Sequence, residues 1–527
     1  MTSSSPGTPA PPDEPLAGGW TRWLIAIAVM ASAVMELVDT SAVNVSIPYI
    51  AGNLSASVTE ATWVLTSYLV SNAIILPMTG WLAGRVGRKR LLLSSIVGFS
   101  AASMLCGLAP TLPLLIAFRV LQGLFGGSLQ PTTRAILLET FPRAQRGHAM
   151  AMWGLGIVVA PIVAPVLGGW LTTDYSWRWV FFINLPVSFF GWIMVKLHVF
   201  DPAYLQRVRR GVDYWGIGFL ALGTASLQIL LDKGQDAGWF SSGFIVALAV
   251  IAMFAAVAFV VRELRTKDPV VHLRLLKYRT FGTAAALSLV LFFVLYGSIL
   301  LLPLFMQEVL QFPAITAGIW NMPRGLATMA LMPVVGYLIG RRWDMRAMLF
   351  IGLLSSAWGV WMFGQLNGAA SPASFLWPQI LMGAGLACVF VPFATISVDP
   401  IPNAEMGYAT SITAFTRNLG SSLGISVMAA MLARGRQTHQ AELVKNVSAT
   451  NAAAAHLHAS LANLLARAGS SVAHAGLQAW GIMLARIQQQ AAVLSYIDAF
   501  RALAILFVVV SPLVWLMRQP QFDKPGA

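Results

Sequence analysis

The feature of this sequence that most constrains its fold is a series of long apolar stretches along nearly the whole chain. An α-helix needs about 20 mostly apolar residues to cross a bilayer, and windows of that size mark about 14 such segments. Transmembrane β-strands would instead alternate polar and apolar residues over segments of about ten residues. The sequence therefore predicts an all-α polytopic membrane protein with about 14 transmembrane helices.

The composition excludes the soluble classes of protein. Of the 527 residues, 57% are hydrophobic and 10% are charged, whereas about 25% are charged in a typical soluble domain. A soluble chain of this size could not hide so much apolar surface from water. A soluble enzyme, a disordered scaffold and a secreted disulfide-rich module are therefore excluded.

The motifs of catalysis and cofactor binding do not fit this chain. Cys106 and Cys388 both lie in apolar runs, which argues against a disulfide framework and a metal cage. The run from Gly420 to Gly424 matches the nucleophile-elbow pattern, but it lies inside an apolar segment, so we interpret it as helix packing. The sequence has no Walker lysine motif for ATP hydrolysis. We expect no enzymatic activity, no cofactor and no metal.

The loop Lys and Arg residues predict the orientation. The net charge is +14, and most of the basic loop residues fall in alternate loops, while the short loops on the other side hold only Arg178 and Lys233. Cytoplasmic loops carry this excess of Lys and Arg. We therefore expect both termini in the cytoplasm, and we interpret the basic excess as an orientation signal rather than a nucleic-acid site.

A weak internal repeat divides the chain. The run Gly80–Arg85 matches Gly336–Arg341, and Pro142–Ala149 matches Pro402–Ala409, at a spacing of about 260 residues in each case. Duplicated bundles that rock about a central site are the architecture of secondary transporters. The predicted organisation is a disordered cytoplasmic tail (1–19), an N-terminal six-helix bundle (20–200), cytoplasmic linkers with two extra transmembrane helices (201–278), a C-terminal six-helix bundle (279–518) and a cytoplasmic tail (519–527).

One long connection lies within the C-terminal bundle. Residues 434–495 are rich in Ala, Leu, Gln and His and contain no Pro, so we expect an extracytoplasmic loop that is largely helical. The run 456–467 is amphipathic. Two interpretations stay open, namely a solvated helical hairpin at the membrane surface and a docking surface for an extracytoplasmic partner.

Two carboxylates lie in the first apolar segment. Glu36 and Asp39 are three residues apart, so they share one face of a helix. A carboxylate at that depth costs several kcal/mol unless it is paired, hydrated or protonated. We predict that Asp39 couples transport to protons, the alternative being a structural carboxylate held by an arginine. Glu36 either shares the proton load or attracts cationic substrates.

Three arginines lie within apolar segments. Arg119 is near the middle of the fourth segment, where its guanidinium stays charged and must find an acceptor. A pair with the Asp39 region would tune the proton site, and a fixed structural strut is the alternative. For Arg324 and Arg417 we expect structural roles.

The segment between the second and third spans is a short basic loop with regularly spaced glycines. Basic loops can be orientation signals alone. The glycines indicate in addition a tight turn that clamps two helices at the cytoplasmic gate, with the arginines pairing to helix ends. The candidate residues of this gate loop are Gly80, Arg85, Gly87 and Arg88.

Glycine and proline dominate the fifth apolar segment. Glycine permits close helix approach and proline kinks a helix, so we expect either a tight, dry seam that keeps the exit closed or a plain packing helix. The candidate residues are Gly154, Gly156, Pro161, Pro165, Gly168 and Gly169.

These motifs together resemble the major facilitator superfamily, and within it the 14-span drug:proton antiporters of the EmrB/QacA type. The resemblance covers about residues 20–518, and it rests on the basic loop and the glycine/proline segment together with the runs Asp39–Pro48, Arg119–Pro131 and Trp177–Pro186. It implies a major facilitator fold of two six-helix bundles with two inserted spans. By the same resemblance, Asp39 is the proton residue of the first span and Arg119 its partner.

The resemblance also implies a function. It implies a bacterial inner-membrane antiporter that exports hydrophobic or amphiphilic compounds by alternating access, driven by the proton gradient without a cofactor. Its partners would be these small molecules, protons and membrane lipids, with a periplasmic adaptor and an outer-membrane channel in double-membrane bacteria. The alternatives are a dedicated exporter of one metabolite or lipid, a proton symporter running inward, and a non-transporting membrane sensor or scaffold.

The sequence departs from the family pattern at three positions. Gly84 stands where the basic loop usually has an acid, so an ion-pair latch through that position is absent. Ala160 and Ala164 stand in the fifth segment where glycine is frequent.

Overall fold

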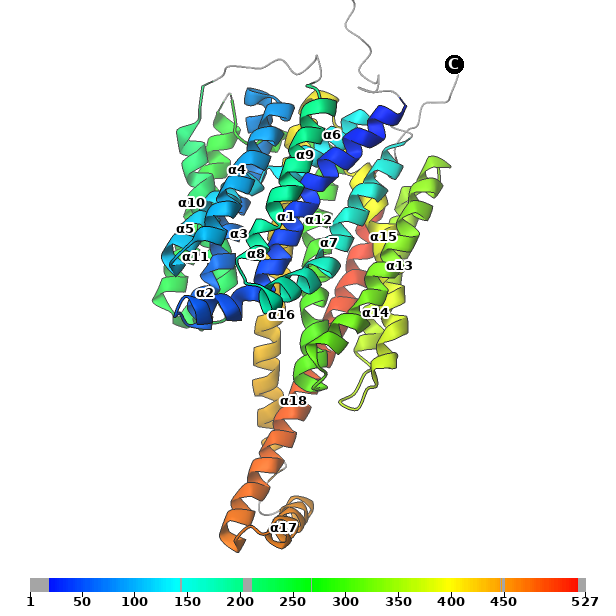
Figure 1. The fold of residues 1–527 in the computed structure, drawn as a ribbon. Coiled ribbons are helices and arrows are strands. Elements are labelled where there is room, and N and C mark those ends of the chain that lie inside the picture. Colours follow the sequence, from blue (N-terminus) through cyan, green and yellow to red (C-terminus); the bar gives the residue numbers. More distant parts are fainter. Residues whose placement is uncertain are drawn as a thin grey trace, which may run out of the picture.

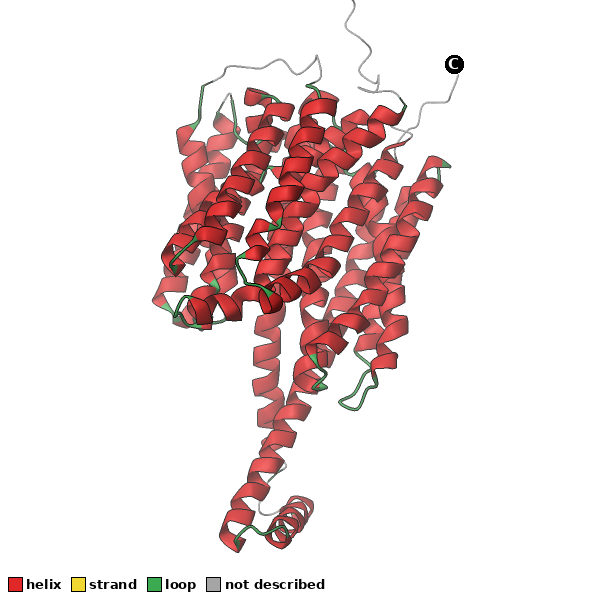
Figure 2. Ribbon diagram, in the orientation of Figure 1, coloured by secondary structure: helices red, strands yellow, loops and turns green. Residues whose placement is uncertain are grey.

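The computed structural model describes residues 19–142, 145–201, 211–266, 268–445, 447 and 451–519. Within these residues every regular element is a helix (Figure 2), which confirms the all-α prediction. The expected tails fall almost entirely outside the described residues, as does most of the linker that precedes residue 211.

The N-terminal bundle holds the first six predicted spans. Its helices are α1 (Trp20–Asn53), α2 (Val58–Ala61) with α3 (Trp63–Val86), α4 (Arg88–Leu108), α5 (Leu112–Gly126) with α6 (Leu129–Thr140), α7 (Arg146–Asp174), and α8 (Trp179–Phe182) with α9 (Asn184–His198). The break between α5 and α6 follows a Gly-Gly pair, which favours a local bend.

The two inserted helices are α10 (Tyr214–Lys233) and α11 (Gly243–Arg265), joined through η2 (Trp239–Ser241). They pack on each other, and α10 also contacts α3 of the first bundle and α16 of the second. Most of the surface of α11 is exposed, and its exposed side chains are largely Val, Phe, Met and Ala. A helix with such a surface suits a lipid environment.

The C-terminal bundle follows a short turn, η3 (Leu273–Lys277). Its elements are α12 (Arg279–Leu304) with η4 (Phe305–Val309), α13 (Ala314–Gly340), α14 (Met345–Phe363), η5 (Pro372–Phe375) with α15 (Leu376–Ile396), η6 (Asn403–Glu405) with α16 (Met406–Lys445), α17 (Ala452–Arg467), and α18 (Val472–Val510) with η7 (Ser511–Leu516).

Within the described residues, 12 helices are long and apolar enough to cross a membrane. The expected spans α7 and α16 are not among them, but both lie alongside the others in the bundle (Figure 1). Helix α7 packs against α1 and α13, and α16 packs against α12 and α18. Fourteen spans therefore stay a prediction with which the structure is compatible.

The bundle has two distinct ends. The beginning of α1 and the end of α18 lie at the same end of the bundle (Figure 1). This end also carries Arg85, Arg88, Lys89 and Arg90 at the α3–α4 turn, and we call it the basic end. Helices α16, α17 and α18 project from the opposite end, the hairpin end. The long connection was expected to be largely helical, and most of its described residues belong to these three helices.

Candidate functional site

Asp39 lies at the centre of a buried polar cluster in the N-terminal bundle. Its side chain is fully buried on α1. Arg119 of α5 donates to Oδ2 at 2.6 Å. The Oδ1 atom accepts from Gln122 at 3.1 Å and from Asn184 of α9 at 2.6 Å. Three donors, one of them cationic, stabilise the ionised carboxylate and offset the cost of its burial.

Arg119 is held by more than its carboxylate. Its Nε donates to the Val64 carbonyl oxygen at 3.1 Å, and Nη1 also reaches Gln122 Oε1 at 2.7 Å. The guanidinium carbon lies 4.2 Å from the centre of the Tyr68 ring. A cation over an aromatic face is stabilised by the negative face of the ring. The structure thus brings Asp39 and Arg119 together, as their charges led us to expect.

Glu36 lies one turn before Asp39 and has weaker partners. Its Oε1 accepts from Asn72 at 2.9 Å and from the Tyr68 hydroxyl at 3.3 Å. Its Oε2 is buried and has no hydrogen-bond partner among the described residues. Gln130 and Arg417 also interact with this carboxyl group. Glu36 therefore has fewer charged hydrogen-bond partners than Asp39, and it also interacts electrostatically with Arg417 of the second bundle.

Arginines of the N-terminal bundle reach the C-terminal bundle. Arg134 of α6 donates to the Thr413 hydroxyl at 3.0 Å, the Ala394 carbonyl at 3.0 Å and the Ser397 hydroxyl at 3.3 Å. In the opposite direction, Arg417 of α16 donates to the Gln130 side chain. These bonds join the two bundles next to Glu36.

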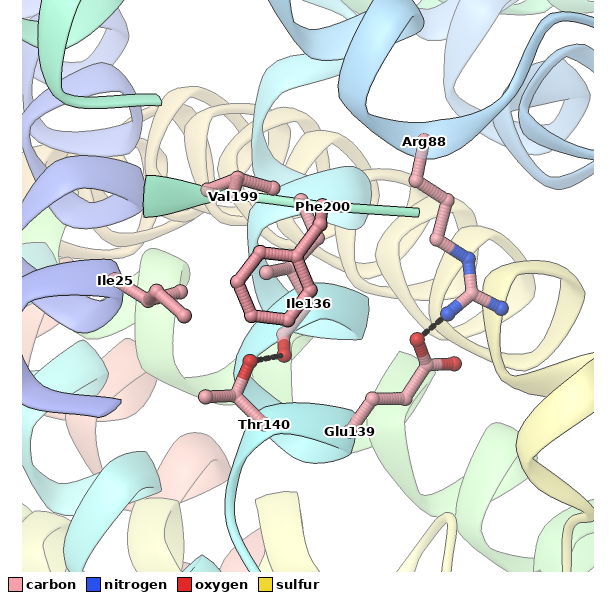
Figure 3. Close-up of a pocket in the computed structure, with 7 residues that line it drawn as sticks. All are labelled: Ile25, Arg88, Ile136, Glu139, Thr140, Val199 and Phe200. Carbon is pink, nitrogen blue, oxygen red and sulfur yellow. Dashed lines mark hydrogen bonds and ion pairs between the residues drawn. The ribbon is translucent and has the colours of Figure 1, made fainter. Parts of the chain in front are cut away.

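A buried ion pair lies at the basic end. Arg88, at the beginning of α4, pairs with Glu139 near the end of α6, beside a small cavity that Phe200 and Ile25 also line (Figure 3). Arg88 also donates to the Asn403 carbonyl oxygen at 3.2 Å, and Arg146 donates to the Asn403 side chain at 3.2 Å. The predicted pairing of Arg88 thus engages both a helix end and the second bundle.

The glycines of the gate loop have separate roles. A Cβ atom on Gly80 would lie 2.6 Å from the Tyr408 Cα, so α3 and α16 approach at backbone distance. Gly87 has a φ of +96°, which favours glycine. Two residues later, the Lys89 N–H donates to Asp201 at 2.8 Å. Arg85 lies over the ring of its own helix neighbour Trp81.

Gly84 stands where the family pattern has an acidic residue, so the ion pair at the basic end uses a different carboxylate. A Cβ at this position would meet only the Tyr408 hydroxyl, at 3.5 Å. The expected absence of an acid there does not leave this end without a buried ion pair, because Glu139 supplies the carboxylate to Arg88. Glu139 was not among the residues that the sequence singled out.

The fifth span makes close contacts on two sides. A Cβ on Gly168 would lie 2.8 Å from the Ala42 Cα, and one on Gly154 would lie 2.9 Å from Met332. Gly156 packs against Val34 of α1 in the same way. Gly169 differs from the expectation, because nothing lies within 4 Å of its Cβ position. Helix α7 continues through both prolines, and the side chain of Pro161 lies outside the described residues.

Several polar residues of the site were not singled out from the sequence. They are Tyr68, Asn72, Gln122, Gln130, Arg134 and Trp153. Gln122 lies one turn after Arg119, and Tyr68 and Asn72 are four residues apart on α3. This helical spacing is the signal that could have found them.

The comparisons with known proteins agree with this fold. The model of the Major Facilitator Superfamily matches residues 29–425. The chain belongs to the major facilitator superfamily. It is therefore a multi-pass membrane protein of a transporter family rather than of an enzyme family, and the family resemblance predicted from the sequence is confirmed.

Two relatives match nearly end to end. Multidrug export protein EmrB of Escherichia coli (strain K12) is 36% identical over 504 residues, which are 94% of this chain and 95% of the relative. Fatty acid resistance protein FarB of Neisseria gonorrhoeae is 35% identical over 513 residues, which are 97% of this chain and 99% of the relative.

Two solved structures share the fold. The human organic anion transporter MFSD10 has a TM-score of 0.61 at 13% identity, over 94% of this chain and 99% of that one. The proton:xylose symporter XylE has a TM-score of 0.58 at 14% identity, over 94% and 95%. At this level of identity the likeness concerns the fold alone, and it confirms the predicted major facilitator architecture.

Proposed function

We propose that this protein is a proton-coupled antiporter that exports hydrophobic or amphiphilic compounds across the bacterial inner membrane by alternating access. The observation that carries the proposal is the buried Asp39–Arg119 pair beside Glu36. Intramembrane ionisable residues are costly and mark ion or substrate pathways. The near full-length similarity to a protein named for multidrug export supports the direction of transport.

The basic end is, on this proposal, the cytoplasmic end. It is closed by Arg88, Arg134 and the backbone contact of Gly80 with Tyr408. The described conformation then corresponds to the half of the cycle in which the site is shut off from the cytoplasm. Opening that end requires these inter-bundle bonds to break, and substrate or protons drive the change only through different affinities for the two conformations.

A polar path connects the proton site to the bundle interface. Arg119 lies over the Tyr68 ring, and the Tyr68 hydroxyl donates to Glu36. Glu36 in turn interacts with Gln130, which accepts from Arg417 of the second bundle. Protonation of Asp39 from outside would weaken its hold on Arg119, and this path would carry the change to the contacts that keep the basic end closed.

The test uses purified protein in liposomes with an imposed pH gradient. Lumenal pH is followed while lipophilic cations, neutral amphiphiles and amphiphilic carboxylates are added, for the wild type, Asp39→Asn and the control Asp236→Asn. Asp236 is an exposed carboxylate of the α10–α11 connection. Substrate-dependent proton movement that is lost only in Asp39→Asn is the expected result. Movement that survives in Asp39→Asn would overturn the role of Asp39, and no movement with any compound would favour the scaffold alternative.

Helices α16, α17 and α18 offer a second element for the proposed export route. They project beyond the bundle at the hairpin end (Figure 1), and α17 carries exposed leucines such as Leu457 and Leu464. We propose this hairpin as the docking surface for a periplasmic adaptor. Deletion of residues 448–470 should leave transport in liposomes intact and abolish co-purification with the adaptor encoded in the same bacterium.

A further inference from the structure

Within the part of the chain that the structure describes, two arginines at the bundle interface form no ion pair with a carboxylate. The Arg134 side chain is 7% exposed, and its acceptors are two hydroxyl groups and a carbonyl oxygen. The acceptor of Arg417 is the amide of Gln130. Among the described residues neither guanidinium forms an ion pair, whereas the buried arginines 88 and 119 each pair with a carboxylate. A buried cation that lacks a counterion is costly.

Trp153 of α7 lies close to both guanidinium groups. Their central carbons are 5.6 Å (Arg134) and 5.8 Å (Arg417) from its ring centre, and Phe292 lies 5.7 Å from Arg417 on the side of the second bundle. The indole Nε1 of Trp153 and the Nε of Arg134 are buried donors that find no acceptor in the described part of the chain. The cluster therefore has an excess of donors and of positive charge beside an aromatic surface.

Glu36 does not balance this charge. It interacts electrostatically with Arg417, but the hydrogen bonds to its Oε1 come from Asn72 and Tyr68 on its own bundle. One carboxylate also cannot neutralise two guanidinium groups. The cluster stays cationic when Glu36 is ionised, and it becomes more so when Glu36 takes up a proton.

We propose that Arg134, Trp153 and Arg417 form an anion-binding subsite that takes the carboxylate or sulfonate group of an aromatic amphiphile. This inference rests on the proposed function, because the ligand would be an exported compound. The oxygens of the anion would accept from the guanidinium groups and the indole N–H, and its ring would pack on Trp153 and Phe292. Arg417 is partly exposed, so it is the group an arriving anion would meet first.

The subsite has a consequence for selectivity. Charged and hydrogen-bonding groups in an otherwise apolar site discriminate strongly, because an analogue that lacks the matching group leaves them unpaired. An aromatic carboxylate should therefore bind better than its neutral amide of the same shape, and a cationic analogue should bind worst. This order is the reverse of what an attraction between Glu36 and cationic substrates would give.

The experiment measures equilibrium binding to the full-length protein in lipid nanodiscs, with empty nanodiscs as the partition blank. Calorimetry measures the affinity of three probes of similar shape. They are biphenyl-4-carboxylate, biphenyl-4-carboxamide and biphenyl-4-ylmethylammonium. The loss of one charge-assisted hydrogen bond lowers the affinity by about ten- to hundredfold. We expect Arg417→Gln to weaken carboxylate binding by about tenfold or more while the amide is unaffected, and Arg417→Lys to retain most of the preference for the carboxylate.

Arg346→Gln is the matched control. Arg346 pairs with Asp344 at the beginning of α14, so its loss should change none of the three affinities. Equal binding of the carboxylate and the amide to the wild type would overturn the proposal. It would also be overturned if Arg417→Gln weakened both ligands alike, since that indicates a structural role. The nanodiscs carry no pH gradient, so the binding result does not depend on proton coupling. Carboxylate binding in nanodiscs without proton movement in liposomes would therefore count against the proposed antiport and not against the anion-binding subsite.

Discussion

The guanidinium carbon of Arg119 lies 4.2 Å from the centre of the Tyr68 ring, and the hydroxyl of the same ring donates to Glu36 at 3.3 Å. Tyr68 is therefore in contact with the charged partners of both halves of the site, since Arg119 holds Asp39. The two interactions can be tested separately, because the Tyr68 ring contacts the Arg119 guanidinium and the Tyr68 hydroxyl donates to the Glu36 carboxylate.

The first prediction concerns Tyr68→Phe. This change keeps the ring under Arg119 and removes the hydroxyl, which donates to Glu36 at 3.3 Å and accepts from Asn72 at 3.4 Å. Each of these hydrogen bonds has a net contribution of about 1 kcal/mol. We expect the protein to remain folded and substrate-driven proton movement to fall, because Glu36 loses its link to the Asp39 cluster. Tyr68→Leu, which removes the ring as well, should lower thermal stability further. Unchanged proton movement in Tyr68→Phe would exclude the hydroxyl from the coupling path.

The sequence shows which residues to suspect when their type is rare in an apolar segment. Glu36, Asp39 and Arg119 could be singled out because a charge inside a membrane segment is costly and must be compensated. Tyr68, Gln122 and Gln130 could not, because uncharged polar residues are common in such segments and their facing partners depend on helix rotation. The span positions follow from hydropathy, but the faces that meet follow from packing.

The ion pair at the basic end and the contacts at the bundle interface were harder still to predict. Glu139 ends an apolar segment in a basic region, so it resembled one more loop charge rather than the partner of Arg88. Arg417 was expected to be structural, and only the arrangement around Trp153 shows that it lies at the bundle interface without a carboxylate. The internal repeat relates the two halves by sequence, but it does not give the register in which they face each other.

The second prediction compares two glycines of α3. Gly80→Ala would place its Cβ 2.6 Å from the Tyr408 backbone, whereas Gly84→Ala would meet only the Tyr408 hydroxyl at 3.5 Å. Backbone cannot yield as a flexible side-chain end can. Gly80→Ala should therefore separate α3 from α16 and favour opening of the basic end, and Gly84→Ala should be nearly neutral.

The measurement is a distance distribution between spin labels at positions 90 and 341. These positions are exposed and lie on opposite bundles at the basic end. A longer distance in Gly80→Ala alone is the expected result. Identical distributions in the two variants would show that this close approach does not hold the end closed.

The third prediction concerns Glu139→Gln. Loss of one partner from a buried ion pair typically costs about 3–5 kcal/mol, because the remaining charge is left uncompensated. Both side chains of the Arg88–Glu139 pair are buried, so we expect a lower melting temperature in detergent and a shift towards the open basic end. Glu442→Gln, which removes an exposed carboxylate paired with Lys445, should change neither. A melting temperature equal to that of the wild type would show that the ion pair contributes no net stability.

The fourth prediction concerns acid stability at the beginning of α10. Asp213 caps this helix by accepting from the Gly216 N–H at 3.1 Å, and it also accepts from Arg262 at 3.1 Å. Burial raises the pKa of Asp213, but the hydrogen bonds from Arg262 and Gly216 outweigh burial and hold the pKa below its usual value. The ionised carboxylate therefore stabilises the folded protein above the ordinary pKa of about 3.9. This contribution is lost as the pH falls through the lowered pKa.

Asp213→Asn tests this relationship directly. The variant should melt at a lower temperature than the wild type near neutral pH, and the difference should shrink as the pH falls below about 4 because the wild-type carboxylate becomes neutral as well. Thermal unfolding of both proteins in detergent, followed by intrinsic tryptophan fluorescence at a series of pH values, measures the difference. A gap that stayed constant down to the lowest pH would mean that Asp213 stabilises α10 through its shape and its neutral hydrogen bonds rather than through its charge.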